Sequence, residues 1–366
     1  MRIFNNIRSV VSLAMLALLA SCTSMEQISI DYLCPAEFSF AENIRRVGVI
    51  AHLDTTGVYA WTDDPLEKDT DLSRASACIV PEAQTVVDSL AQVMADNGFF
   101  DDVMVGDFQV VAHDSVQQHA PITREAVAEL TELMDVDFII AVEDMKMDFH
   151  KKISVLPEYM VAYGEMTSVV DARLGFYQSL SDRPFYTAAS RDTLCWEAYG
   201  TTEEMVEAEM DEEELTRQAC RLVGESLVMK FLPHWETAER VYFGSGNVNM
   251  RNAHVYAQEN NWSEARKLWK REYELTKRVK KQMLLSHNIA LSYEMEDELE
   301  SALNWAQKSV EASAKFLSKT REKKEHFSEN DTDLYLKMDV YLSTLMKRIE
   351  DRTKLKLQMR GIDANF

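Results

Sequence analysis

The pattern of apolar and polar positions divides the chain into a first part of strands and helices and a second part of helices only. Nearly unbroken apolar runs at 47–53 and 138–142 are typical of central strands that are covered on both faces. Between these runs, apolar residues at helical spacing predict helices from Pro81 and from about Thr123, separated by a short strand over 103–111. This order predicts a sheet that carries helices.

Apolar and polar residues then alternate over 158–180, which predicts a long antiparallel strand with one exposed face. The segment "SLSDRP" is typical of a turn, and residues 185–196 are expected to return as the partner strand. A helix is predicted from about Glu212 to Phe231. The order β-α-β-α-β-β-β-α indicates an α/β domain of mixed sheet over 45–238, and the whole chain an α+β fold that continues into helices.

From residue 249 a scheme of small and aromatic residues occurs twice, and the matching alanines Ala265 and Ala302 lie 37 residues apart. Paired antiparallel helices need small residues where they cross closely and aromatic residues between them, so 239–366 resembles tetratricopeptide-like repeats. An apolar stripe over 334–349 predicts a capping helix. Two repeats are few for an independent array, so packing against the α/β domain is expected. The repeat signature, which is also the candidate partner surface, comprises Ala253, Tyr256, Trp262, Ala265, Trp269, Ala290, Tyr293 and Ala302. The tryptophans of this region either line a peptide groove or fill the core, and their helical spacing favours the core.

The first residues contain a short apolar run that ends near a cysteine. Two arginines precede an apolar run of about 11 residues, which is shorter than the roughly 20 that a spanning helix needs. Leu19-Ala20-Ser21-Cys22 is similar to the lipobox. This resemblance implies that 1–21 is a signal peptide that is removed and that Cys22 is lipidated, with 22–44 as anchor and tether. The alternative is an ordinary secretory peptide with an incidental cysteine.

The residue after the cysteine bears on the location. Thr23 stands where an aspartate would retain an enteric lipoprotein in the inner membrane, so the resemblance implies the outer membrane. The segment "TSMEQ" has no dense acidic cluster of the kind that sends some lipoproteins to the cell exterior. We therefore expect a lipid-anchored protein that faces the periplasm.

Several segments together carry a family resemblance. The lipobox, the strand "RRVGVIAHLD", the acidic α/β region and the repeat "HNIALSYE" resemble a family of uncharacterised tetratricopeptide-repeat-containing outer-membrane lipoproteins of Bacteroidota. The resemblance implies location and architecture, and it implies no activity.

Charge is distributed unevenly along the chain. Residues 23–238 contain 14 Lys and Arg against 41 Asp and Glu, whereas residues 239–366 contain 23 against 20, which supports two domains. The acidic part repels nucleic-acid phosphates, so no nucleic-acid partner is expected. With 46% apolar and 27% charged residues, wholesale disorder is excluded.

Four cysteines follow the anchor: Cys34, Cys78, Cys195 and Cys220. In an exported chain they allow three disulfide pairings, or they are buried free thiols. None lies in a CxxC motif, so the sequence supports no zinc site.

Few residues suggest chemistry. His52 and Asp54 end the first central strand, where α/β sheets commonly bind ligands, and they offer two metal ligands or an acid–base pair without an identifiable third partner. The acidic run over 203–214 is interpreted as a solvated loop because it lacks the glycine turn of a calcium loop. The 19 methionines are scattered, which favours core packing over a soft-metal site. No cofactor and no metal are predicted.

The sequence thus predicts a non-enzymatic, membrane-anchored lipoprotein that acts in protein interaction or envelope assembly. Its expected partners are the membrane, through Cys22, and an envelope protein. The alternative hypothesis is a hydrolase or a small-ligand receptor that uses the strand end near His52 and Asp54.

Overall fold

The computed structural model describes residues 25–41, 44–52, 62–63, 72–79, 83–109, 121–156, 159, 161–322 and 329–360. The chain forms two compact units. One, here the sheet unit, comprises the described residues from Pro35 to His234 and from Leu357 to Arg360; the other, here the helical unit, comprises the described residues up to Cys34 and those within Trp235–Lys356. The predicted signal peptide, Cys22 and Asp54 lie outside the described residues.

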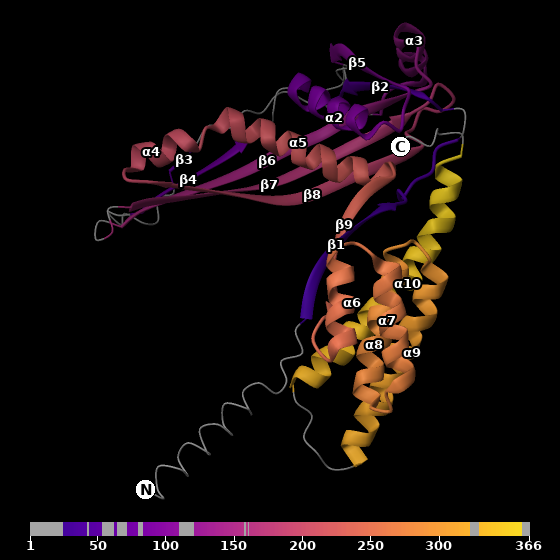
Figure 1. Cartoon of the computed structure of the whole chain (residues 1–366). Coiled ribbons are helices and arrows are strands. Elements are labelled where there is room, and N and C mark those ends of the chain that lie inside the picture. The colour runs from indigo at the N-terminus through magenta and orange to yellow at the C-terminus, as the bar shows by residue number, and fades with distance from the viewer. Residues whose placement is uncertain are drawn as a thin grey trace, which may run out of the picture. The chain divides into compact units, whose positions relative to one another are not determined.

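The sheet unit is built on a mixed sheet (Figure 1). Strand β2 (Arg46–Ala51) lies between β5 (Asp102–Gln109) and the first part of β6 (Phe138–Leu156), and it runs parallel to both. The other pairings are antiparallel: β6 with β7 (Val161–Tyr177), β7 with β8 (Tyr186–Gly200), and the second part of β6 with β4 (Leu72–Ile79), which also pairs with the short β3 (Thr62–Asp63). The predicted mixed sheet is confirmed.

Helices cover both faces of the sheet around β2. Val47 and Val49 belong to the main core together with residues of α2 (Ala83–Asn97) and α5 (Glu212–Phe231). Ile50 points to the other side and packs with residues of α3 (Arg124–Met134). The unbroken apolar run at β2 follows from this burial on two faces, since residues 47–51 are all buried.

Two segments of the sheet unit differ from the predicted loops. The composition of residues 54–80, with Gly57, Pro65 and several aspartates, predicts a loop, yet this segment contains β3 and β4. The acidic run contains the short helix α4 (Glu203–Glu209), which begins because the Thr202 hydroxyl accepts the Met205 N–H. Glu203 and Glu204 lie in its first turn, where negative charge favours a helix, so part of the acidic run is helical where a solvated loop was predicted.

The helical unit contains the predicted helix pairs and the capping helix. The described residues form α6 (Val248–Gln258), α7 (Trp262–Leu275), α8 (Val279–Glu294), α9 (Leu299–Glu322) and α10 (Glu329–Gln358), as labelled in Figure 1. The turns between paired helices contain Asn260 and Asp297, both with φ of 57°, a conformation that asparagine and aspartate tolerate better than most residues. None of the described helices is long and apolar enough to cross a membrane.

A two-stranded ribbon completes the helical unit. Strand β1 (Met25–Cys34) pairs with β9 (His234–Phe243), and side-chain contacts of Ser29 with Glu239 and of Asp31 with Thr237 show that the strands are antiparallel. The expected tether at 22–44 therefore contains a strand, and the expected domain boundary after residue 238 falls inside β9. The alternating pattern of β1 does not identify its partner strand, because that strand lies about 200 residues away in the sequence.

We predict that Gly164→Ala destabilises the sheet unit by about 1–3 kcal/mol. A methyl group on Gly164 of β7 would meet Val206 of α4 and lie 2.6 Å from the Met210 Cε atom, so α4 would have to move. The check is urea denaturation followed by circular dichroism.

The matched control is Gly224→Ala in α5, where the nearest atoms lie 3.8 Å from the added methyl group. Because alanine is the better helix former, this variant is expected to gain about 0.5–1 kcal/mol. Equal losses in the two variants would contradict the assignment of a close α4–β7 contact.

Candidate functional site

The repeat signature forms the interior of the helical unit. Tyr256 and Tyr293 are half-buried, as is the neighbouring Trp305. The six other signature side chains are at most 2% exposed; they are Ala253, Trp262, Ala265, Trp269, Ala290 and Ala302. These residues hold the helices together, as their spacing favoured, and they leave little surface for a partner. A partner surface has to be sought elsewhere on the unit.

Strand β9 is bound to one face of α8. The Asn288 side chain accepts the Phe243 N–H at 2.9 Å and donates to the Phe243 carbonyl oxygen, also at 2.9 Å. His287 Nε2 donates to the Val241 carbonyl oxygen at 2.8 Å. An amide that pairs with both polar groups of one residue holds an extended backbone much as a neighbouring strand would. The repeats thus bind a segment of their own chain.

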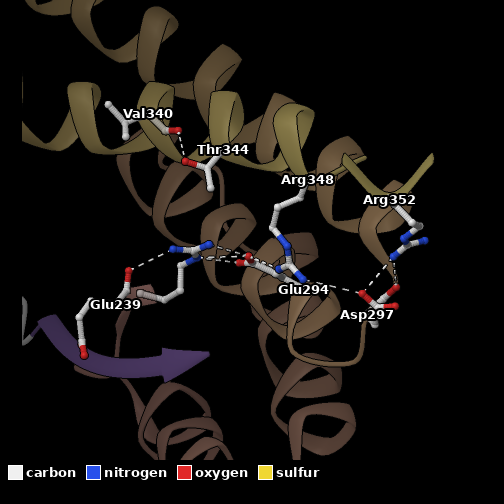
Figure 2. Close-up of polar contacts among 8 residues, drawn as sticks. Glu239, Glu294, Asp297, Val340, Thr344, Arg348 and Arg352 are labelled. Carbon is white, nitrogen blue, oxygen red and sulfur yellow. Dashed lines mark hydrogen bonds and ion pairs between the residues drawn. The ribbon is translucent and has the colours of Figure 1, made fainter. Parts of the chain in front are cut away.

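A buried ion triad lies where the ribbon, α8 and α10 meet. Glu294 of α8 has a fully buried side chain, and the guanidinium groups of Arg240 from β9 and Arg348 from α10 contact it with exposed fractions of 10% and 9%. Arg240 Nε lies 3.1 Å from Glu294 Oε2, and Arg348 Nη1 lies 2.6 Å from Oε1 (Figure 2). One carboxylate therefore joins three elements that are distant in sequence.

Further groups surround the two guanidinium groups. Asp297, in the turn after α8, accepts from Arg352 at 3.0 Å and lies 3.8 Å from Arg348 (Figure 2). The Tyr32 ring of β1 lies under Arg348, 4.3 Å from the guanidinium carbon to the ring centre. Tyr341 of α10 is buried beside the triad, and its pKa is raised by burial and by the charge of Glu294, so this phenol stays neutral. The aromatic rings and Asp297 compensate the cationic excess of the triad.

A cleft opens beside this triad, and we call it the ribbon cleft. Its volume is about 350 Å³. Four segments contribute lining residues: 30–34 of β1, Trp235 of β9, 294–299 from the end of α8 to the start of α9, and 348–355 of α10. A second hollow of about 430 Å³ shares Tyr32, Cys34 and Asp351 with it. Trp235 is 60% exposed. The cleft combines apolar side chains with arginines that carboxylates hold in place.

The cysteine in the cleft, Cys34, has low reactivity. The Cys34 thiol donates to Glu236 at 3.2 Å, and burial, that hydrogen bond and the nearby carboxylates raise its pKa to about 12. The thiolate, which is the reactive form, is therefore scarce at neutral pH. Cys195 and Cys220 are free thiols as well, so no disulfide joins these three cysteines; the side chain of Cys78 lies outside the described residues.

A second buried carboxylate lies at the other end of the helical unit. Glu272 of α7 accepts from Asn247 at 2.7 Å, from Asn249 at 2.6 Å and from Lys281 at 2.7 Å. The hydrogen bond from Lys281 is the main reason that the pKa of Glu272 is lowered to about 2. These contacts connect the start of α6, the end of α7 and the start of α8.

The sheet unit contains the strand end at which sequence reasoning placed an alternative site. His52 is 9% exposed, and its backbone N–H donates to the Val142 carbonyl oxygen at 2.9 Å. Because Ala51 pairs with Val142 in a parallel register, His52 is level with Glu143 of β6. Asp54 lies outside the described residues, so the predicted pair cannot be placed together.

Glu143 has partners that sequence reasoning missed. It accepts from the Tyr177 hydroxyl and lies 3.1 Å from Arg173 Nε, at an irregularity of β6 between Val142 and Asp144. Such bulges are common next to functional sites and redirect side chains. The phenol is buried, which together with Glu143 raises the pKa of Tyr177 and keeps its proton in place. The three side chains form a local polar network, and the described residues contain no cluster of metal-ligating side chains.

Two family models match the chain. The model described as Domain of unknown function (DUF8603) covers residues 44–243, and the model described as Domain of unknown function (DUF6340) covers residues 251–347. The first match extends over more than half of the chain and ends at the last residue of β9. Comparisons with curated proteins and with solved structures returned no match.

We predict that Glu294→Gln costs about 3–5 kcal/mol of folding stability, because two largely buried guanidinium groups lose their charged partner. The measurement is the free energy of unfolding in urea. Arg348→Met added to Glu294→Gln should recover part of the loss, since it removes one unpaired charge. The control is Glu239→Gln on the exposed part of β9, for which less than about 1 kcal/mol is expected. Similar losses for both glutamates would mean that the triad is not a major contributor to stability.

A second prediction concerns pH. Burial lowers the pKa of His287 to about 4, whereas the unfolded chain titrates near 6.5, so the unfolded state binds the extra proton first. This histidine's contribution is complete above pH 6.5 and is lost as the pH falls toward 4, by on the order of 3 kcal/mol. Urea denaturation between pH 7 and pH 4 measures the effect. His287→Gln keeps a donor for Val241 but cannot be protonated, and an unchanged pH dependence in that variant would contradict the assignment.

Proposed function

We propose that this chain, which belongs to the family described as Domain of unknown function (DUF8603), is a lipid-anchored, non-enzymatic module that binds a protein partner in a bacterial envelope. The anchor is Cys22, and the location is the periplasm-facing side of the outer membrane, as the lipobox and Thr23 indicate. The finer resemblance to outer-membrane lipoproteins of Bacteroidota is part of this proposal.

The observation that carries the proposal is the ribbon cleft. Its wall includes an exposed tryptophan, which is a side chain that often anchors protein contacts, together with the apolar Leu33 and Leu355. Arg348 is held by Glu294 and Arg352 by Asp297, so these two arginines form a fixed rim of the cleft. A protein segment with apolar anchor residues fits this combination.

The internal use of the repeats supports the same location for the partner. The signature residues are core, and the face of α8 that could receive an extended segment holds β9 through Asn288 and His287. The thiol of Cys34 has a raised pKa, which agrees with a binding role better than with nucleophilic catalysis. A hydrolase or small-ligand receptor at the strand end near His52 and Asp54 is the alternative, supported by the level position of Glu143.

We predict that a photo-crosslinking amino acid in place of Trp235 captures one envelope protein in living cells. The same amino acid in place of Val255, which is 49% exposed on α6, should not capture it. Leu355→Asp, combined with the probe at position 235, should reduce capture about tenfold or more, because a buried carboxylate opposes an apolar contact. Equal capture at both positions would contradict the cleft as the contact.

The same cells test the anchor. Wild-type protein is expected in the outer-membrane fraction, and Cys22→Ala protein in the soluble periplasm. A variant that stays in the membrane fraction to the same extent would contradict lipid attachment through Cys22.

A further inference from the structure

One end of the helical unit lies opposite the ribbon cleft. It contains the start of β1 and one end of each helix of the unit. Lys337 Nζ of α10 lies 4.0 Å from Met25 Sδ at the start of β1. Phe243 at the end of β9 packs with Met283 of α8, and Val279 and Leu334 pack against the same cluster. We call this end of the unit the anchor end, because Met25 follows Cys22 by three residues.

Exposed cations gather at the anchor end. Lys277 and Arg278 lie in the α7–α8 connection, and Lys280 follows in the first turn of α8, 5.4 Å from the Phe316 ring of α9. Lys315 and Lys319, on either side of that ring in sequence, are exposed on the last turns of α9.

The nearby acids are largely engaged. Glu272 accepts three hydrogen bonds, and Asp333 pairs with Lys337 at 2.7 Å, while Glu26 is half-buried and Glu274 is exposed. The surface of the described anchor end is therefore cationic.

Exposed apolar side chains lie among these cations. Leu275 at the end of α7 is 68% exposed, Val248 at the start of α6 is 59% exposed, and Leu336 beside Lys337 is 53% exposed. Met25 itself is 43% exposed. Large apolar side chains that share an exposed surface with lysine and arginine are typical of surfaces that rest on a lipid headgroup layer.

We propose that the anchor end of the helical unit rests on the anionic lipid headgroups of the membrane to which Cys22 attaches the chain. This inference builds on the proposed lipid attachment. Three residues span at most about 10 Å, so an acylated Cys22 would hold the start of β1 at the headgroups. Lysine and arginine near an anionic leaflet are attracted to it. The attachment point and this attraction therefore select the same face of the helical unit.

The test uses the chain from Thr23 onward, which retains every described residue and carries no lipid. It is sedimented with vesicles of neutral phosphatidylcholine, or with vesicles that contain anionic phosphatidylglycerol in addition. We expect partitioning into the anionic vesicles to exceed that into neutral ones by about tenfold, and to decline at high salt because exposed charges are screened.

The variant Lys277→Glu/Arg278→Glu/Lys315→Glu/Lys319→Glu should remove most of the preference for anionic vesicles, and Leu275→Asp should weaken binding without removing the salt dependence. The control, Lys267→Glu/Lys308→Glu, changes cations in the middle of α7 and α9 and should bind like wild type. Circular dichroism confirms folding of each variant.

Equal binding to neutral and anionic vesicles, or equal losses in the anchor-end and control variants, would overturn the inference. Because Cys22 is absent from this experiment, its result does not depend on lipid attachment. Fractionation of Cys22→Ala cells tests the attachment separately, so the two failures can be told apart.

Discussion

The arrangement of the helical unit depends on one buried carboxylate. Glu294 has a fully buried side chain, and an isolated charge at such a position would cost several kcal/mol or more. Arg240 and Arg348 remove that cost only when β9 and α10 are both in place. The triad thereby favours one packing of three elements that apolar contacts alone would position less specifically. The same contacts form one wall of the ribbon cleft, so the cleft is as rigid as the triad.

The ribbon also explains how so few repeats form a stable unit. Helical repeats bury a continuous core by stacking, and an end repeat leaves a face uncovered. Here α10 covers one side, and β9 covers α8 through Asn288 and His287. The unit includes strands from both ends of the α/β domain's sequence, and one of them, β9, fills the face that a longer array would offer to a peptide.

Local and periodic features were predictable from sequence, and long-range polar pairing was not. The apolar run at β2 predicted a strand covered on both faces, and the spacing of Ala265 and Ala302 predicted the helix pairs, because each pattern reports burial directly. Strand β1 was missed since its partner is remote. Glu294 occupies the same helical stripe as Met283 and His287, and a charge in a buried stripe was an available signal for an ion partner. The identity of that partner required the fold.

Strand β1 links the two surfaces for which we propose roles. It begins at Met25, next to the cationic anchor end, and ends at Cys34, in the ribbon cleft. A strand of this length spans about 30 Å, since each residue advances roughly 3.3 Å. Both of its ends are fixed within one unit, by contacts near Lys337 at the start and by the Tyr32–Arg348 contact near the finish. A lipid on Cys22 would therefore hold the cleft, and any segment bound in it, at a defined height above the membrane. A flexible tether over the same residues would leave that height undefined.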